Sequence, residues 1–206
     1  MAATATLTFR VLGPVEVWRE GAELALGGPK PRALLAALLL RPNAPVSTDT
    51  LIEAIWGDDL PDRAANAVQV YVSQLRKALG RDRITTAPTG YQLRVESGEL
   101  DAELYEVARR AAKVAAERGD PGAAARVLRE ALGLWRGPAY QGLADEPFLR
   151  AEAARLDEAR LVGIEERIDA DLALGAHDSL VGEIEAFLAA HPLRERLWGQ
   201  LMIALY

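Results

Sequence analysis

The sequence contains no cysteine, and its 206 residues include only two histidines. Without cysteine the protein forms neither a disulfide framework nor a thiolate metal site. His177 and His191 lack the H-x-x-x-H spacing that would bring two imidazoles to one metal on a helix face. We therefore predict no metal site and no cofactor, and the lack of cysteine is compatible with a reducing cytoplasm.

Long apolar runs and a leader pattern are also missing. The longest apolar run covers residues 33–40, whereas a membrane-spanning helix needs about 20 such residues. No basic region followed by an apolar run opens the sequence, so we expect no signal peptide. These absences predict a cytoplasmic protein without a membrane partner.

Signatures of an enzyme are absent as well. The stretch Gly27-Gly28-Pro29-Lys30-Pro31-Arg32 lacks the spacing of a phosphate-binding loop, and its prolines remove N–H donors. It is better explained as a turn into a helix. No Ser-His-Asp set is recognisable, and Asp/Glu pairs beside Arg are typical of solvated helix faces. We predict that the protein is not an enzyme.

The net charge of −6 conceals an uneven distribution along the chain. Residues 1–97 carry 11 Lys and Arg against 10 Asp and Glu, whereas residues 98–206 carry 13 against 20. Only Asp82 opposes the basic residues of the stretch 63–83, which are Arg63, Arg76, Lys77, Arg81 and Arg83. On charge alone, a phosphate-contacting stripe and a solvated helix face explain this stretch equally well.

The first 97 residues have the pattern of a small mixed domain. Residues 7–26 contain three short β-like runs separated by Gly-Pro and Glu-Gly turns, which predict an antiparallel sheet. A Ser-Thr-Asp cluster at 47–49 is a helix start signal, and Asp62 is expected to cap a further helix. The predicted helices are 32–41, 50–56 and 63–79, followed by a hairpin of strands 83–86 and 91–95.

After Ser97-Gly98 the sequence becomes alanine-rich and helical in pattern. Gly-Asp-type turns between helix pairs suggest stacked hairpins of the tetratricopeptide kind. The large aromatic residues here, Trp135, Phe148, Phe187 and Trp198, fit core anchors better than a concave peptide-binding surface. The last helix has no capping segment after it, so we expect a longer natural protein. The predicted helices are 101–118, 121–135, 148–174, 178–190 and 193–206.

The stretch ANAVQVYVSQLRKALGR, residues 65–81, is ambiguous between strand and helix. A strand explains its first alternating residues but fails at Ser73-Gln74. A helix collects apolar residues on one side at steps of three and four, which satisfies an amphipathic helix. This inward set is Ala64, Val68, Tyr71, Val72, Leu75 and Leu79.

The opposite helix face carries no acid. Gln bonds adenine bidentately and Val contacts a thymine methyl group in the major groove, while Asn, Ser, Arg and Lys hold phosphates. A polar face alone is weak evidence, because it is more typical of a helix that merely contacts solvent. Three helices followed by a hairpin, however, form a winged helix-turn-helix, whose last helix enters the major groove. The outward residues are Asn66, Gln69, Val70, Ser73, Gln74 and Lys77, with Arg76 at the edge.

The motifs LIEAIWGDDLP, RAANAVQVYVSQLRKALG and ITTAPTGYQL resemble the DNA-binding domains of the OmpR/PhoB type. With FRVLGPVEVWREGAELALGGPKPRALLAALLL before them and DAELYEVARRAA to HPLRERLWGQLMIALY behind them, the whole chain resembles the SARP family, the Streptomyces antibiotic regulatory proteins. The resemblance implies a mainly α fold with a small β component. A winged helix-turn-helix domain at 1–97 would precede an all-α, tetratricopeptide-like bacterial transcriptional activation domain at 98–206.

The resemblance also assigns roles to residues. Base edges would be contacted by Gln69, Val70, Ser73 and Gln74, and phosphates by Asn66, Tyr71, Arg76 and Lys77. The wing, residues 85–90, would lie at the adjacent minor groove. Ala87 replaces the arginine that is usual there, which leaves the wing only hydroxyls for phosphates, those of Thr85, Thr86 and Thr89.

The loop 57–62 faces RNA polymerase in related activators, so Asp58 and Asp59 become candidate polymerase contacts. Acids that simply favour the following helix N-terminus explain them equally well.

The family resemblance implies an activator of antibiotic biosynthesis genes that binds double-stranded DNA as a dimer, at direct repeats near the −35 region. It would recruit RNA polymerase holoenzyme through its sigma and alpha subunits. The alternative is a helical-repeat protein–protein adaptor with a winged helix that does not bind DNA. The excess of Arg over Lys, 21 to 3, fits a GC-rich actinobacterial source.

Overall fold

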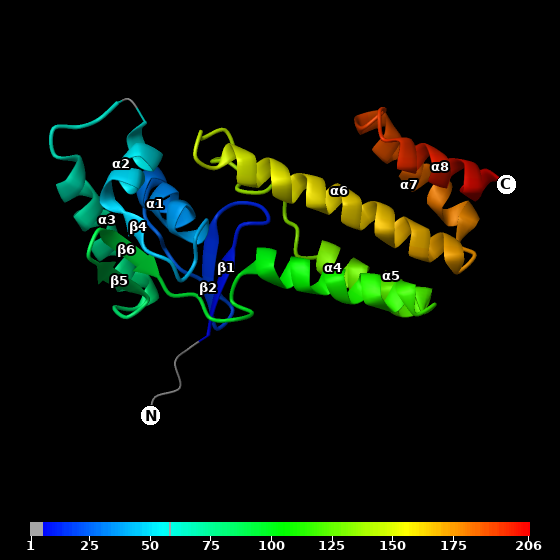
Figure 1. Ribbon diagram of the computed structural model, residues 1–206, viewed down its shortest axis with the longest axis horizontal. Coiled ribbons are helices and arrows are strands. Elements are labelled where there is room, and N and C mark those ends of the chain that lie inside the picture. Colours follow the sequence, from blue (N-terminus) through cyan, green and yellow to red (C-terminus); the bar gives the residue numbers. More distant parts are fainter. Residues whose placement is uncertain (1–5, 58) are drawn as a thin grey trace. The chain divides into compact units, whose positions relative to one another are not determined.

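The computed structural model describes residues 6–57 and 59–206, and the chain divides into two compact units (Figure 1). The first unit comprises the described residues up to Glu103 together with Trp135–Leu156. The second comprises Leu104–Leu134 and Asp157–Tyr206. A segment from the alanine-rich half of the sequence therefore belongs to the compact unit formed by the N-terminal half.

The first unit has the predicted winged helix-turn-helix order, with a small sheet, three helices and a hairpin. The predicted N-terminal sheet is confirmed as an antiparallel sheet of order β1-β2-β3. A second sheet of order β4-β6-β5 contains the hairpin. The elements are β1 Leu7–Arg10, β2 Glu16–Arg19, β3 Ala22–Glu23, α1 Pro29–Leu39, β4 Val46–Ser47, α2 Thr48–Trp56, α3 Ala64–Leu79, β5 Ile84–Ala87 and β6 Gly90–Leu93.

The rest of the chain is mainly helical, as predicted, and the helix ends differ from the predicted ones by at most three residues. No helix within the described part of the chain is long and apolar enough to cross a membrane. The helices are α4 Asp101–Glu117, α5 Pro121–Leu132, α6 Arg150–Ala173, α7 His177–Ala190 and α8 Glu195–Leu205.

The starts of the first three helices show which local signals were sufficient. Pro29 occupies the first turn of α1, where its missing N–H costs nothing. The Ser47 hydroxyl accepts the Thr50 N–H at 3.0 Å and caps α2. The prediction that Asp62 caps α3 is wrong, because Arg63 occupies the N-cap position and makes no side-chain cap.

The hairpin packs closely against the entry to α2. β6 pairs with β4, so that Gly90 lies opposite Ser47. A β-carbon at Gly90 would collide with the Val46 carbonyl oxygen and crowd the Ser47 Cα at 2.8 Å. Glycine at the hairpin turn therefore allows the wing to approach the helix-turn-helix closely.

An ion pair is buried beneath the start of the hairpin. The Arg83 guanidinium donates to both oxygens of Glu99 at 2.6 and 2.7 Å, and both side chains are almost wholly buried. Glu99 also accepts the N–H groups of Glu96 at 2.8 Å and Leu7 at 3.3 Å. The pair thus joins β5, the end of the hairpin and β1.

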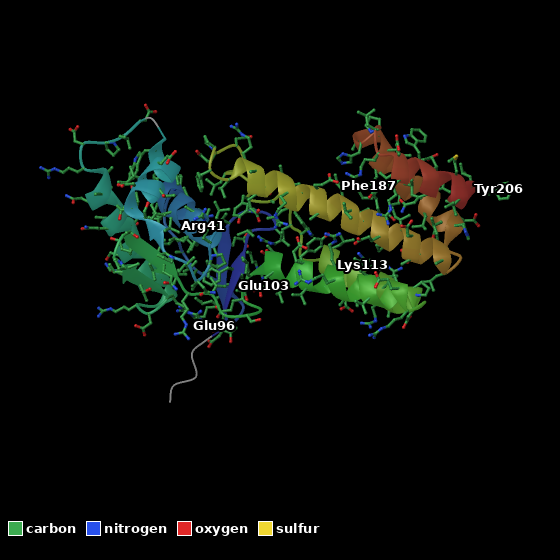
Figure 2. All side chains as sticks on the ribbon, viewed as in Figure 1. Arg41, Glu96, Glu103, Lys113, Phe187 and Tyr206 are labelled. Atoms are coloured by element: carbon green, nitrogen blue, oxygen red, sulfur yellow. The ribbon has the colours of Figure 1, made fainter. Side chains whose placement is uncertain are left out.

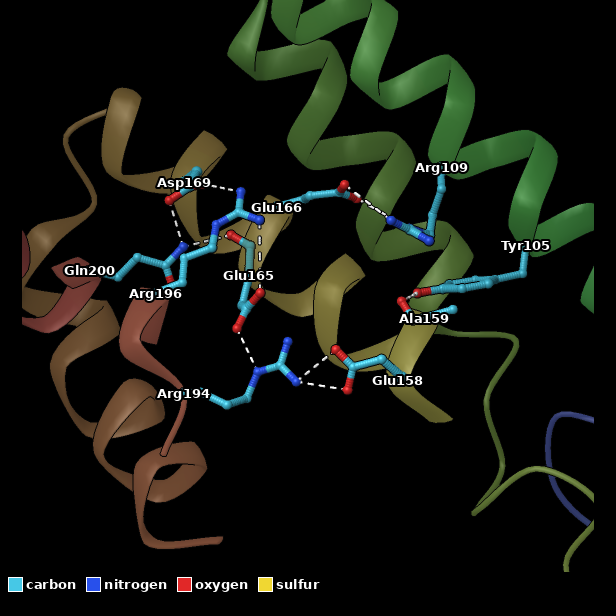
Figure 3. Close-up of polar contacts among 10 residues, drawn as sticks. All are labelled: Tyr105, Arg109, Glu158, Ala159, Glu165, Glu166, Asp169, Arg194, Arg196 and Gln200. Carbon is cyan, nitrogen blue, oxygen red and sulfur yellow. Dashed lines mark hydrogen bonds and ion pairs between the residues drawn. The ribbon is translucent and has the colours of Figure 1, made fainter. Parts of the chain in front are cut away.

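Ionic contacts of α6 organise the second unit (Figure 3). Arg194, just before α8, donates to Glu165 at 2.6 Å and Glu158 at 2.8 Å. Arg109 on α4 holds Glu166 at 3.1 Å. Acids along α6 therefore bind arginines from other segments, which fixes where those segments contact the helix.

α4 and α6 also approach closely through one aromatic residue. The Tyr105 hydroxyl donates to the Ala159 carbonyl at 2.9 Å, and a β-carbon at Gly163 would collide with that hydroxyl. Burial raises the pKa of Tyr105 from 10.0 to about 12, so the phenol keeps its proton to a higher pH than an exposed tyrosine.

The apolar contacts of α6, α7 and α8 complete the second unit, but not with every predicted anchor. Ile168, Ile184 and Leu197 are almost fully buried in one cluster, and Phe187 packs against it. The prediction that Trp198 is a core anchor is wrong, because it is 49% exposed. Figure 2 shows the side chain of Tyr206 projecting outward at the end of the chain.

We expect Arg83→Met to lower the free energy of unfolding by about 3–5 kcal/mol, because it leaves a buried carboxylate without its counter-charge. Arg94→Met is the matched control, since Arg94 pairs with Glu96 at 2.6 Å but both side chains are at least half exposed. Such a surface pair contributes about 1 kcal/mol or less. Urea unfolding followed by circular dichroism measures both; equal losses would contradict the buried role of Arg83.

Glu99 also predicts a pH dependence of stability. Burial favours the neutral acid, but the hydrogen bonds from Arg83 and Glu96 and the Arg83 charge outweigh it, so the pKa of Glu99 lies below 4.5. Its contribution is therefore complete above pH 4.5 and is lost as the pH falls through the lowered pKa. We expect the stability difference between wild type and Glu99→Gln to shrink on acidification. A stability difference between the two proteins that stays the same at every pH would contradict this.

Candidate nucleic-acid interface

The inward face of α3 anchors this helix in the first unit. Val68, Val72, Leu75 and Leu79 are buried at the predicted steps of three and four. Tyr71 is only half-buried, and its ring stacks on Trp56 at a centroid distance of 6.1 Å. The helical interpretation of this stretch is confirmed.

The outward face of α3 is polar and exposed. It carries no carboxylate between Ala64 and Leu79. One large apolar residue, Val70, is 53% exposed among these polar neighbours. The exposed residues of this face are Asn66, Gln69, Val70, Ser73, Gln74 and Lys77.

The C-terminal end of α3 is held from the N-terminal sheet. Arg19, at the end of β2, donates from Nη2 to the carbonyls of Ala78 at 3.0 Å and Leu79 at 2.8 Å. These carbonyls belong to the last turn, where a helix leaves acceptors unpaired and favours a positive charge. Arg19 therefore positions α3, although sequence analysis did not identify it.

Arg76 connects α3 to the hairpin. Its Nε donates to the Ile84 carbonyl at 2.8 Å, and its Nη2 donates to the Thr86 hydroxyl at 3.0 Å. The guanidinium also lies 5.8 Å from the centre of the Tyr91 ring. The structure therefore gives Arg76 a positioning role between helix and wing, in addition to its predicted contact with phosphate.

The basic stripe is smaller than its sequence suggests. Arg83 does not belong to it, because this side chain is buried against Glu99. Lys77 and Arg81 are exposed, and with Ser73 and Arg76 they line a hollow of about 390 Å³. Basic groups and a hydroxyl thus surround a concave surface beside the polar face, which suits an anionic ligand such as a phosphate.

The hairpin places its hydroxyl groups beside α3. Thr85 and Thr86 on β5 and Thr89 in the turn are all exposed. Thr86 is directly linked to the α3 face through Arg76. The structure therefore brings the predicted helix residues and at least this part of the wing together.

The predicted polymerase-contacting loop is described only in part. Asp58 lies outside the described residues. Asp59 is exposed, and its N–H donates to the Trp56 carbonyl at 3.0 Å. Leu60 beside it is 59% exposed. The loop therefore presents at least one acid and one apolar side chain to solvent.

The chemical groups that this surface exposes are mainly amides, hydroxyls and cations. Among the described residues, no group of three or more His, Cys, Asp or Glu side chains is arranged to hold a metal ion. The surface instead offers amide, hydroxyl and cationic groups around one apolar side chain, which suits base edges and phosphates.

Two protein-family models match the chain in the order that its motifs predict. Residues 21–93 match the model for the C-terminal part of transcriptional regulatory proteins. Residues 100–206 match the bacterial transcriptional activator domain. Together these matches cover both α3 with its wing and the helices that follow.

Curated relatives of this chain are named as regulatory proteins. The chain is 42% identical to the regulatory protein AfsR of Streptomyces griseus. The match covers 100% of this chain and 21% of AfsR. It is 34% identical to the regulatory protein DnrI of Streptomyces peucetius, covering 97% of this chain and 78% of DnrI. The chain thus spans about a fifth of AfsR but most of DnrI.

A solved structure has the same fold. EmbR of Mycobacterium tuberculosis, in complex with a low-affinity phosphopeptide, matches with a TM-score of 0.92 and 35% identity. The match covers 97% of this chain and 54% of EmbR. Taken with both family models and the relatives, it establishes that the chain belongs to the SARP family of transcriptional regulators.

Proposed function

We propose that the protein is a sequence-specific transcriptional activator that reads DNA with α3 and the wing. The observation that carries the proposal is the exposed, acid-free face of α3, where Gln69, Val70 and Gln74 stand together. Gln matches the donor and acceptor of adenine, and Val70 matches a thymine methyl group. In the major groove, a thymine methyl group would give the exposed Val70 an apolar partner.

Phosphate contacts complete this proposal. Asn66, Tyr71, Lys77 and the hydroxyls of the wing would fix the register on the duplex, and Arg76 would do so while holding the hairpin. Such contacts carry no sequence information but supply much of the affinity. The two kinds of contact therefore respond differently to mutation.

We further propose that two protomers bind direct repeats near a −35 region and recruit RNA polymerase through its sigma and alpha subunits. Residues 1–97 would bind DNA, and residues 98–206 would form the activation module. Exposed Asp59, together with Asp58, would contact a basic polymerase surface. Genes for antibiotic biosynthesis are the proposed targets, and the cytoplasm is the proposed place of action.

Gln74→Ala and Lys77→Ala separate base reading from phosphate binding. Gln74→Ala should lose about 1–3 kcal/mol of discrimination at one base pair and relax specificity there. Lys77→Ala should weaken all sequences alike and reduce the slope of log affinity against log salt by about 1. In vitro selection of bound DNA and fluorescence anisotropy across salt concentrations measure these effects.

Arg118→Ala is the matched charge control, because Arg118 is also exposed but lies beyond the end of α4. Its salt dependence should equal that of wild type. Unchanged specificity in Gln74→Ala, together with an unchanged salt slope in Lys77→Ala, would contradict groove reading by α3. The absence of DNA binding by wild type would favour a protein–protein adaptor.

Replacing both Asp58 and Asp59 with alanine should reduce activated transcription in vitro several-fold while DNA affinity stays at the wild-type value. The reason is that an acid pair facing polymerase contributes nothing to holding phosphates. Glu185→Ala, an exposed acid on α7, is the control and should leave transcription unchanged. Parallel loss of DNA binding and transcription would argue against a polymerase contact.

A further inference from the structure

The outer edge of the N-terminal sheet is covered by residues that follow the hairpin. The order β1-β2-β3 leaves one side of β1 without a neighbouring strand. On that side the Phe9 N–H donates to the Glu99 carbonyl at 2.6 Å. The Asp101 carboxylate then accepts the N–H groups of Val11 at 2.8 Å and Leu12 at 3.1 Å. Backbone groups that an edge strand would expose are therefore satisfied.

A second segment continues this cover. Residues 135–149, here called the strap, connect α5 to α6 and belong to the same compact unit as β1. Pro14 and Gln141 form a parallel β-bridge. The backbone N–H groups of the strap donate to the stretch after β1, from Arg136 to Leu12 and from Tyr140 to Val11 at 2.8 Å each, and from Gln141 to Gly13 at 3.0 Å.

Arg136 joins the strap to three other places in the unit. Its guanidinium lies 2.9 Å from Glu16 on β2 and 3.3 Å from Asp101 at the start of α4. It also donates to the Pro14 carbonyl at 3.2 Å. The Asp101 side chain is only 4% exposed, so its contacts with Arg136 and with the backbone that follows β1 form inside the protein.

A series of contacts connects the Arg136–Asp101 pair with α3, the helix proposed to read DNA. Asp101 follows Glu99 by two residues, and Glu99 holds Arg83 immediately before β5. From β5, the Ile84 carbonyl accepts the Arg76 guanidinium on α3. β1 also pairs with β2, whose Arg19 caps the end of α3. Both routes reach α3 without passing through a residue of its outward face.

We propose that the strap and residues 99–101 hold α3 in its DNA-reading position, with Arg136 as the positioning residue that fastens them. The strap is continuous with α5 and α6, which lie largely in the second unit. A partner or ligand that displaces α5 or α6 would thereby change DNA binding without touching DNA. The DNA-binding part of this inference rests on the proposed function.

The test uses the full chain with Arg136→Met and, as a control, Arg126→Met, whose exposed pair with Glu130 lies within α5. Hydrogen–deuterium exchange should increase in residues 7–13 and 136–141 of the Arg136 variant, while α7 and α8 remain as protected as in wild type. Its affinity for selected DNA should fall at least several-fold. The control should match wild type in both measurements.

A reversible cross-link separates the role of the strap from general damage. Because the chain has no cysteine, Pro14→Cys with Gln141→Cys introduces a single possible pair. Bridge partners in a β-ladder have the Cα separation that a disulfide spans. Oxidation of this pair in the Arg136→Met background should restore both protection and DNA affinity, and reduction should abolish them again. The oxidised and reduced forms are compared in the same way if the reduced variant is too unstable to fold.

Unchanged exchange at residues 7–13 in Arg136→Met would overturn the proposal, as would a uniform increase over the whole chain. Failure of the oxidised cross-link to restore protection would overturn it as well. If wild type binds no DNA, the proposed function fails, whereas exchange and its restoration still decide whether Arg136 fastens the strap. Loss of DNA affinity with normal exchange would assign Arg136 to the DNA surface instead.

Discussion

A carboxylate that is removed from water needs compensation inside the protein, and Glu99 obtains it from several parts of the chain. Arg83 supplies the charge, and Leu7 and Glu96 supply N–H groups to the carboxylate. The backbone carbonyl of Glu99 separately accepts the Phe9 N–H. Each of these groups is fixed only when the others are in place, because a buried ion pair with incomplete hydrogen bonding is costly. The wing, the N-terminal sheet and the start of α4 consequently have a common reference point. The position of α3 depends on the same point through β5.

The sequence was sufficient for the elements whose signals are local. Periodicity separated the inward and outward residues of α3, and Gly-Asp turns divided the helices of the second unit. The prediction that Arg83 belongs to an exposed basic stripe is wrong. It relied on local signals alone, because the basic neighbours at 76, 77 and 81 indicate a surface stripe. Its partner Glu99 lies 16 residues away, beyond the hairpin. Nothing in the spacing of the two residues indicates that they meet.

Contacts at longer range were beyond sequence reasoning altogether. Arg19 meets the end of α3 across 60 residues, and Arg136 meets Pro14 across 122. A periodic pattern shows which face of an element is buried but does not identify the segment that covers a sheet edge. The outward residues of α3 were therefore predictable, whereas the residues that position α3 were not. Trp198 shows a related limit, since an aromatic residue at helical spacing need not face the core.

Arginine side chains in the second unit contribute geometry as well as charge. α6 carries acids on several of its sides, and bidentate guanidinium groups orient the segments that meet them. Lysine would supply the charge without the planar geometry that fixes direction. Many side chains in this alanine-rich sequence are too small to interlock between helices. Such ion pairs therefore define the register between helices.

The strap limits how parts of such proteins can be exchanged by genetic recombination within the family. The N-terminal compact unit is discontinuous in sequence, because it needs residues 135–156 as well as those before 104. A genetic crossover near residue 97 would join the β1 of one parent to the Asp101 and Arg136 of the other. Viable recombinants would have to retain compatible residues at both places. The two halves of such a regulator are therefore expected to change together rather than as interchangeable cassettes.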